Sequence, residues 1–264
     1  MATSLNHRLT IQFALDGFSF AIFDNTNNKL LAWDCHQSDR NTVGNELFNS
    51  IEKAIADKGF DGIKHYPVTF IIDERTNILV PEAIYSRDDN SKLLGFSFNT
   101  ANDIVSQADT LTKHKVVNVF ALARDLKEKV LAKWPEATIT HSSSLFLESL
   151  PESAEPAVYV NVRHHDFDIA IMKNRLQFFN NFQFNDKNDF AYFLLNVLQQ
   201  QNISSKSTTV CFSGQILPTS EIIGLCGQFV KDIQFVERPD TLQVDEAFAE
   251  VPYQYYHIQY QAIR

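Results

Sequence analysis

The stretch QFALDGFSFAIF, residues 12–23, decides the fold of this chain because its pattern recurs in NVRHHDFDIAIM, residues 161–172. The two stretches align without a gap, so that Ala21 falls on Ala170 and Ile22 on Ile171. Each has apolar flanks around a polar centre, which predicts two strands joined by a tight turn. The repeat predicts a chain built from two related halves.

The same order of elements surrounds both copies. In the first half we predict strands at 9–15, 18–24, 30–34 and 67–73, and in the second half strands at 157–162, 167–172, 176–184 and 208–213. A helix follows the third strand in each half, over 41–59 in the first and from about Asp186 in the second. The first helix has Leu47, Ile51 and Ile55 on one face with Val43, and Asn41 or Thr42 as its N-cap.

The segment between the two copies is expected to connect the two halves. It contains a strand at 116–122, a helix at 123–134, a strand at 137–141 and a short helix at 142–150. The linker PESAEP follows at 151–156. We therefore expect two lobes, residues 1–150 and 151–264.

Two α/β halves that each open with a three-strand meander resemble the duplicated, ribonuclease H-like architecture of the actin-like ATPase superfamily. That superfamily includes actin, heat-shock-70 chaperones, sugar kinases and related cell-division and pilus proteins. In size and in the segment VDEAFAEVPYQYYHIQYQ, residues 244–261, the chain is most similar to a bacterial domain-of-unknown-function family with this fold. The resemblance covers most of the chain and rests on the order and pattern of its elements.

The resemblance implies two phosphate turns, each reading Asp-x-Gly, which hold nucleotide phosphates and Mg²⁺. The aspartate positions fall on Gln12 and Asn161, and an amide supplies no net negative charge for Mg²⁺. The glycine positions fall on Ala14 in the first turn and on Arg163, His164 and His165 in the second. The side chains of Arg163 and the two histidines would occupy the space that phosphates need, so we predict degenerate phosphate turns and no catalytic residue.

Other residues near these turns could still bind a ligand. Asp16, Asp166 and Asp168 are candidate carboxylates, but their positions in or beside hairpin turns explain them better. If a nucleotide or another anion binds, the positions expected to hold it are Asp16, Gly17, Arg163, Asp166 and Gly214. Arg163 and the two histidines form either an anion site or a solvated turn.

A third motif of the superfamily, a strand followed by glycines and a helix, packs against the adenosine. Here VCFSGQILPTSEIIGLCGQF, residues 210–229, keeps Gly214 but has Gln215 at the second glycine position. We predict a tight strand-to-helix turn, then a helix that begins at Pro218 with Ile222, Cys226 and Phe229 facing inward.

No other constellation of residues predicts catalysis. His164 and Asp166 could share one side of an extended segment, but His165 would point away and no third ligand has zinc-like spacing. Cys35 and His36 are adjacent, and neighbouring side chains of an extended chain diverge. We therefore predict no metal site.

Composition narrows the classes of partner. The net charge is −9 without a long basic cluster, which argues against nucleic acid. Neither a signal peptide nor a run of about eighteen apolar residues is present, so we expect a cytoplasmic protein without a membrane partner. Three unpaired cysteines fit reduced core thiols. Only 8 of 264 residues are glycine, which is few for a chain with phosphate-wrapping loops.

These observations predict a non-catalytic interaction or assembly module that binds another protein or itself. The segment PYQYYHIQYQ, residues 252–261, is either a contact surface or a final element packed on a lobe. The alternative is an ATP-binding, Mg²⁺-dependent enzyme or switch that uses Asp16, Asp166 or Asp168.

Overall fold

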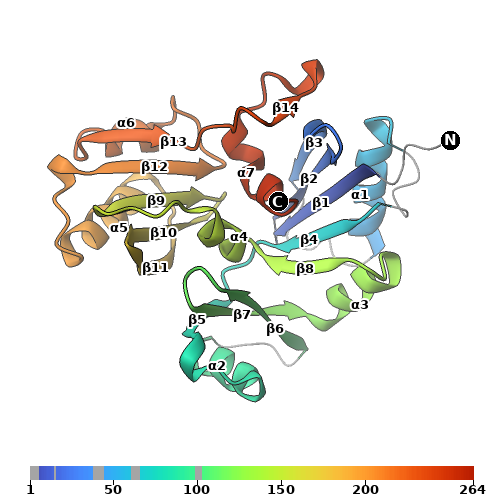
Figure 1. Cartoon of the computed structure of the whole chain (residues 1–264), viewed down its shortest axis with the longest axis horizontal. Coiled ribbons are helices and arrows are strands. Elements are labelled where there is room, and N and C mark those ends of the chain that lie inside the picture. The colour runs from blue at the N-terminus through green and yellow to red at the C-terminus, as the bar shows by residue number, and fades with distance from the viewer. Residues whose placement is uncertain (1–5, 15, 38–44, 61–65, 99–102) are drawn as a thin grey trace. The chain divides into compact units, whose positions relative to one another are not determined.

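The computed structural model describes residues 6–14, 16–37, 45–60, 66–98 and 103–264 (Figure 1). The chain divides into two compact units. The first lobe comprises residues 1–148, 240–250 and 259–264, and the second lobe comprises residues 149–239 and 251–258. Each lobe has its own sheet and its own buried apolar cluster.

The first lobe is built on a six-stranded sheet in the order β14-β3-β2-β1-β4-β8 (Figure 1). Its strands are β1 (His7–Ala14), β2 (Gly17–Asp24), β3 (Lys29–Gln37), β4 (Val68–Ile72), β8 (Thr138–His141) and β14 (Gln243–Val244). The first three form the predicted antiparallel meander, and β4 pairs in parallel with β1 and β8. Seven of the eight residues of β2 are buried, because this strand lies inside the sheet and is covered on both faces.

Helices α1 (Asn45–Asp57), α3 (Arg124–Lys133) and α4 (Ser142–Ser149) belong to this lobe, apart from the last residue of α4. Leu47, Ile51 and Ile55 are buried in its core, as their spacing predicts. The predicted N-cap at Asn41 or Thr42 and the apolar residue Val43 lie outside the described residues.

A three-stranded antiparallel sheet is a second layer of structure in the first lobe. Its order is β5-β7-β6, with β5 at Asn77–Pro81, β6 at Ile104–Leu111 and β7 at Val116–Ala123. The short turns η3 (Glu82–Ile84) and η4 (Arg87–Asp89) lead into α2 (Asn90–Ser97), whose Leu94 is buried against this sheet. The sequence predicted β7 but neither of its partner strands.

The second lobe repeats the meander in a five-stranded sheet of order β11-β10-β9-β12-β13 (Figure 1). Its strands are β9 (Ala157–Val162), β10 (Asp166–Lys173), β11 (Arg175–Gln183), β12 (Thr209–Gly214) and β13 (Asp232–Phe235). The meander strands pair antiparallel, and β12 pairs in parallel with β9 and β13. The predicted duplication is confirmed at the level of element order.

Two helices, α5 and α6, cover this sheet. Helix α5 (Lys187–Gln200) begins after Asp186, whose carboxylate accepts hydrogen bonds from the backbone N–H groups of Asn188 and Asp189. Helix α6 (Glu221–Cys226) follows a short 3-10 turn, η5 (Ser205–Ser207), and β12. No helix among the described residues combines the length and apolar character needed to cross a bilayer.

The predicted limits of α6 are wrong. The helix begins at Glu221 rather than at Pro218, because Ser220 accepts a hydrogen bond from the N–H of Ile223 and caps it there. It ends at Cys226, so Phe229 lies beyond the helix and is 40% exposed instead of facing inward.

The C-terminal tyrosines lie in the interior. Helix α7 (Tyr253–Gln261) follows the 3-10 turn η6 (Glu246–Phe248), and its Tyr253, Tyr256 and Tyr260 are all less than 10% exposed. Of the two alternatives for this segment, the burial of these three residues fits a final element packed on a lobe rather than a contact surface. Their rings supply buried apolar area to the chain itself.

The three cysteines are free thiols in different surroundings. Cys226 is buried and Cys211 is half-buried, whereas Cys35 on β3 is exposed, so the expectation of core thiols is wrong for Cys35. Desolvation by burial raises the pKa of Cys211 and of Cys226 to about 11.

We expect one thiol of the folded protein, that of Cys35, to react ahead of the other two. The thiolate is the nucleophile, so Cys211 and Cys226 should resist a disulfide reagent at neutral pH and react only after unfolding. Cys35 should react first, although slowly, because desolvation and the charges of Asp34 and Asp16 raise its pKa. Thiol titration of native protein, urea-unfolded protein and a Cys35→Ser variant measures this. Fast labelling of the native Cys35→Ser variant would contradict it.

Candidate functional site

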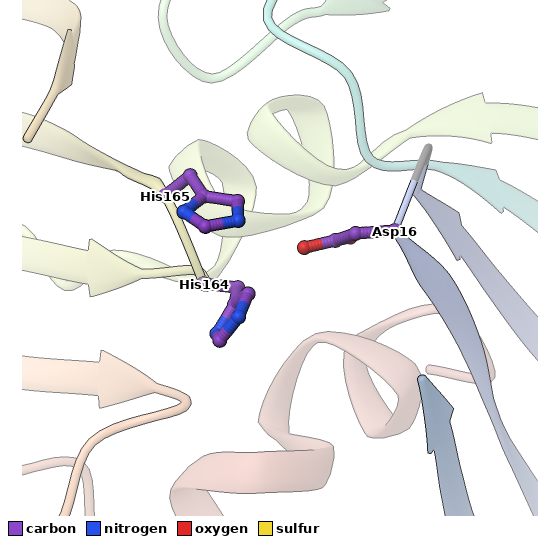
Figure 2. A group of neighbouring side chains, drawn as sticks. All are labelled: Asp16, His164 and His165. Atoms are coloured by element: carbon purple, nitrogen blue, oxygen red, sulfur yellow. The ribbon is translucent and has the colours of Figure 1, made fainter. Parts of the chain in front are cut away.

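The candidate site in the second lobe is the turn between β9 and β10. The backbone N–H of Arg163 donates to the carbonyl of Asp166 at 2.9 Å and closes the turn. His164 and His165 form its tip and are exposed, with ring centroids 4.3 Å apart. Figure 2 shows the two rings gathered at the tip, and also Asp16, which belongs to the first lobe. The expectation that His165 points away from His164 is therefore wrong.

The side chain of Arg163 folds back onto the sheet instead of extending into solvent. Its Nη1 and Nη2 atoms donate to the two carboxylate oxygens of Asp168 at 2.8 and 2.9 Å, and its Nε donates to Asp166. Arg163 is 8% exposed and Asp168 is fully buried. The fork of the guanidinium matches the two oxygens of one carboxylate, which is the strongest geometry for such a pair.

Asn181 on the neighbouring strand β11 completes this arrangement. Its side-chain amide donates to Asp168 Oδ1 at 3.0 Å and to Asp166 Oδ1 at 3.1 Å. Asn181 stands directly opposite Asp168 in the antiparallel pair of β10 and β11, which explains why their side chains meet. We call Arg163, Asp166, Asp168 and Asn181 the turn cluster.

The charged groups of the turn cluster pair with one another. Both oxygens of Asp168 accept from Arg163, and one of them also accepts from Asn181. A Mg²⁺ ion would have to compete with a guanidinium for these oxygens at the centre of a buried ion pair. Three donors of Arg163 are directed at Asp166 and Asp168 rather than at solvent or an external anion, whereas His164 and His165 at the tip of the turn are exposed.

Asn161, the amide in place of the second expected aspartate, also has a hydrogen-bond partner within the second lobe. It lies opposite Asp168 in the β9–β10 pair and next to Ser213 of β12. The hydroxyl of Ser213 donates to Asn161 Oδ1 at 3.1 Å, and Asn161 is 1% exposed. This oxygen therefore faces a hydroxyl donor rather than an open space.

Gly214 lets β12 approach β9 closely. Its φ of +84° is left-handed, and a Cβ there would lie 2.1 Å from the carbonyl oxygen of Val162 and 2.9 Å from Asn161 Oδ1. The next residue, Gln215, donates its N–H to the same carbonyl at 2.7 Å. Strand pairing and the turn toward α6 thus account for this glycine.

In the first lobe, Gln12 occupies the position of the other expected aspartate. Its side-chain amide donates to Asp73 Oδ2 at 2.6 Å, and Asp73 follows the end of β4, the parallel neighbour of β1. Asp16 and Gly17 form the turn that leads into β2. Gly17 has a φ of +153°, and a Cβ there would meet the carbonyl oxygen of His36 at 2.1 Å.

Sequence reasoning missed three partners of these residues, namely Asn181, Ser213 and Asp73. Ser213 and Asp73 stand at the carboxyl ends of the strands predicted to follow each helix, and polar residues there are a signal for a site at that sheet edge. Asn181 carries no such signal, because its role depends on the register between β10 and β11.

Comparison with known proteins gives the family. A family model described as "Protein of unknown function (DUF3822)" matches residues 1–233. The chain belongs to the DUF3822 family. No curated protein matches it.

Solved structures give the fold. A Bacteroides thetaiotaomicron protein described as having an actin-like ATPase fold and unknown function is 18% identical, with a TM-score of 0.76 over 89% of this chain and 93% of its own. A structure of the PilM–PilN type IV pilus biogenesis complex matches over 98% of this chain and 97% of its own, with 10% identity and a TM-score of 0.57. This DUF3822 member therefore has the actin-like ATPase fold, as its resemblance implied.

Proposed function

We propose that this protein is a pseudo-ATPase, a cytoplasmic and non-catalytic interaction or assembly module on an actin-like scaffold. The observation that carries the proposal is the bidentate ion pair between Arg163 and the buried Asp168 at the second phosphate turn. In that position the superfamily has a glycine-rich turn around the phosphates. The free thiols are compatible with a reducing compartment.

The amide replacements support the loss of nucleotide chemistry. Gln12 and Asn161 stand where a carboxylate would hold the hydrated cation, and each makes a hydrogen bond within its own lobe. An amide at such a position contributes a dipole but no net charge, whereas Mg²⁺ binding depends on anionic oxygen ligands.

A role in protein assembly has support from the fold neighbour. The PilM–PilN structure is described as a pilus biogenesis complex, so the same fold takes part there in a complex with a second protein. A scaffold without nucleotide chemistry still offers strand edges and loops to a partner.

The alternative function is an ATP-binding enzyme or switch with non-standard carboxylates. Asp16 is the carboxylate that favours it, since it lies half-exposed in the first turn. Asp166 and Asp168 argue against it, because Arg163 and Asn181 donate to Oδ1 of Asp166 and to both oxygens of Asp168.

We expect ATP and Mg²⁺ to leave the unfolding temperature of the protein unchanged. A ligand at about 100 times its Kd would add roughly 2.7 kcal/mol to the stability and shift the midpoint by about 5–11 °C for a chain of this size. Thermal unfolding with ATP and Mg²⁺, with ATP and a chelator, and with Mg²⁺ alone makes the comparison. A rise that requires both ATP and Mg²⁺ would favour the alternative function, and an Asp16→Asn variant would then show whether Asp16 holds the ion.

A further inference from the structure

Strand β11 is a long sheet edge without a partner strand among the described residues. It has nine residues and ends the five-stranded sheet, with β10 on its other side. Between Leu176 and Gln183 it has no charged residue and no proline. Such an edge presents unpaired N–H and C=O groups to any strand that approaches it.

The other sheet edges in the described part of the chain carry features that discourage pairing. Strands β8 and β13 have four residues each and β14 has two. Strand β5 ends in Pro81, and β6 has Asp109 in its second half. Short length, proline and charge are the usual protections of an edge, and β11 lacks them between Leu176 and Gln183.

The sequence of β11 is close to symmetric about Asn180. In QFFNNFQ, residues 177–183, the outer glutamines match, and Phe178 matches Phe182. Two antiparallel copies of this strand, paired about Asn180, place Phe178 opposite Phe182 of the partner subunit and Gln177 opposite Gln183 of the partner subunit. No like charges meet in this register, and aromatic pairs directly across an antiparallel ladder stabilise it.

On the face of the sheet that packs on the second-lobe core, the side chains of β11 are compatible with this pairing. Phe178 and Phe182 are partly buried and pack against the second-lobe core, where Phe182 stacks on Phe193 of α5 at 5.2 Å. Asn180 between them is exposed. A second copy would continue the row of phenylalanines across the two-fold axis, so the apolar surface of both edges would be covered at once.

One irregularity limits the length of the pairing. Opposite β10, the register shifts between Ile171 and Met172, so that Gln177 of β11 is the extra residue of a bulge. Phe178 to Gln183 keeps a regular register. The five residues 178–182 are therefore the regular part of the edge, and they are symmetric about Asn180 except that Phe179 stands opposite Asn181 of the partner subunit.

We propose that β11 is a homodimer interface, in which two copies of the chain join their five-stranded sheets antiparallel about Asn180. The partner is a second copy rather than another protein, because the edge is complementary to itself in pattern and charge. The inference goes beyond the loss of nucleotide chemistry, since the pairing does not depend on whether ATP binds.

Disulfide trapping tests both the surface and the register. At the two-fold axis the two Asn180 Cα atoms would lie about 4.5–5.5 Å apart, within the range that a disulfide spans. In a Cys35→Ser background, Asn180→Cys should therefore give a covalent dimer under mild oxidation. Gln183→Cys is the matched control, because it is exposed on the same strand but lies about 20 Å from its copy in this register.

Sedimentation of the unmodified chain supplies the equilibrium measurement. We expect a species of twice the 30.2 kDa chain mass that dissociates on dilution. A strict monomer at high concentration would overturn the proposal. Equal cross-linking of Asn180→Cys and Gln183→Cys, or cross-linking of neither, would overturn it as well. These outcomes are separate from the ATP measurement, so either proposal can fail alone.

Discussion

Replacing Asp168 with alanine is expected to lower the free energy of unfolding by about 3–5 kcal/mol. Asp168 is fully buried and accepts from both terminal nitrogens of Arg163 and from Asn181. Its removal leaves a largely buried guanidinium with only Asp166 as a charged partner in the turn cluster. Urea unfolding of the two proteins measures the loss, which should appear as a lower midpoint with an unchanged slope.

Two further variants distinguish the effect of the Arg163–Asp168 ion pair from the general effect of removing a charged side chain. Asp232→Ala removes an exposed aspartate of the same lobe and should change stability by no more than about 0.5 kcal/mol. The double variant Arg163→Met/Asp168→Leu removes both charges at once and should be closer to the parent protein than Asp168→Ala, because apolar residues of similar volume often replace a buried ion pair at little cost.

The sign of the change distinguishes a structural role from a ligand-binding role. A carboxylate kept for a metal ion is destabilising without the ion, so its removal would leave the stability unchanged or raise it. A stability of Asp168→Ala at or above that of the parent protein would therefore contradict the internal role of the turn cluster.

Substitution of Gly214 by alanine is expected to lower the free energy of unfolding by roughly 2–4 kcal/mol. The left-handed φ of +84° strains any other residue, and the new Cβ would lie 2.1 Å from the backbone carbonyl of Val162. Since that oxygen belongs to the backbone of β9, relief requires the two strands to move apart.

Gly224→Ala is the matched control for this substitution. Gly224 lies in α6 of the same lobe, and nothing lies within 4 Å of the position that its Cβ would occupy. Alanine there should raise stability by about 0.5–1 kcal/mol, because it restricts the unfolded chain and favours helix. Comparison of the two unfolding midpoints makes the test, and a Gly214→Ala protein as stable as Gly224→Ala would show that β9 and β12 do not need this close approach.

The duplicated meander could be predicted from the sequence because both its signals are local. Alternating apolar residues and Asp-Gly or Asn-rich turns define strands such as β1 and β10 without knowledge of the rest of the chain. Strand β6 was missed because its alternation is interrupted, with Ser106, Gln107 and Asp109 among its eight residues. Strand β14 has only two residues, and its pairing with β3 depends on a contact far apart in sequence.

The turn cluster could not be predicted from local sequence patterns. Arg163 follows a buried strand in a turn, and turns usually lie in solvent. Its burial depends on Asp168 standing across the ladder and on Asn181 one strand further, and both facts are set by strand register. The burial of the tyrosines of α7 could not be predicted either, because tyrosine suits a buried helix and an exposed contact surface equally well.

The ion pair between Arg163 and Asp168 also constrains how this lineage can change. A glycine at position 163 would leave the buried Asp168 without the Arg163 guanidinium, and a change of Asp168 first would leave the largely buried Arg163 with Asp166 as its charged partner in the turn cluster. Each single step crosses a stability deficit of about 3–5 kcal/mol, which is a large part of the total stability of an ordinary domain. The two positions are therefore coupled by epistasis, and replacements of Arg163 and Asp168 are tolerated best when both residues change together.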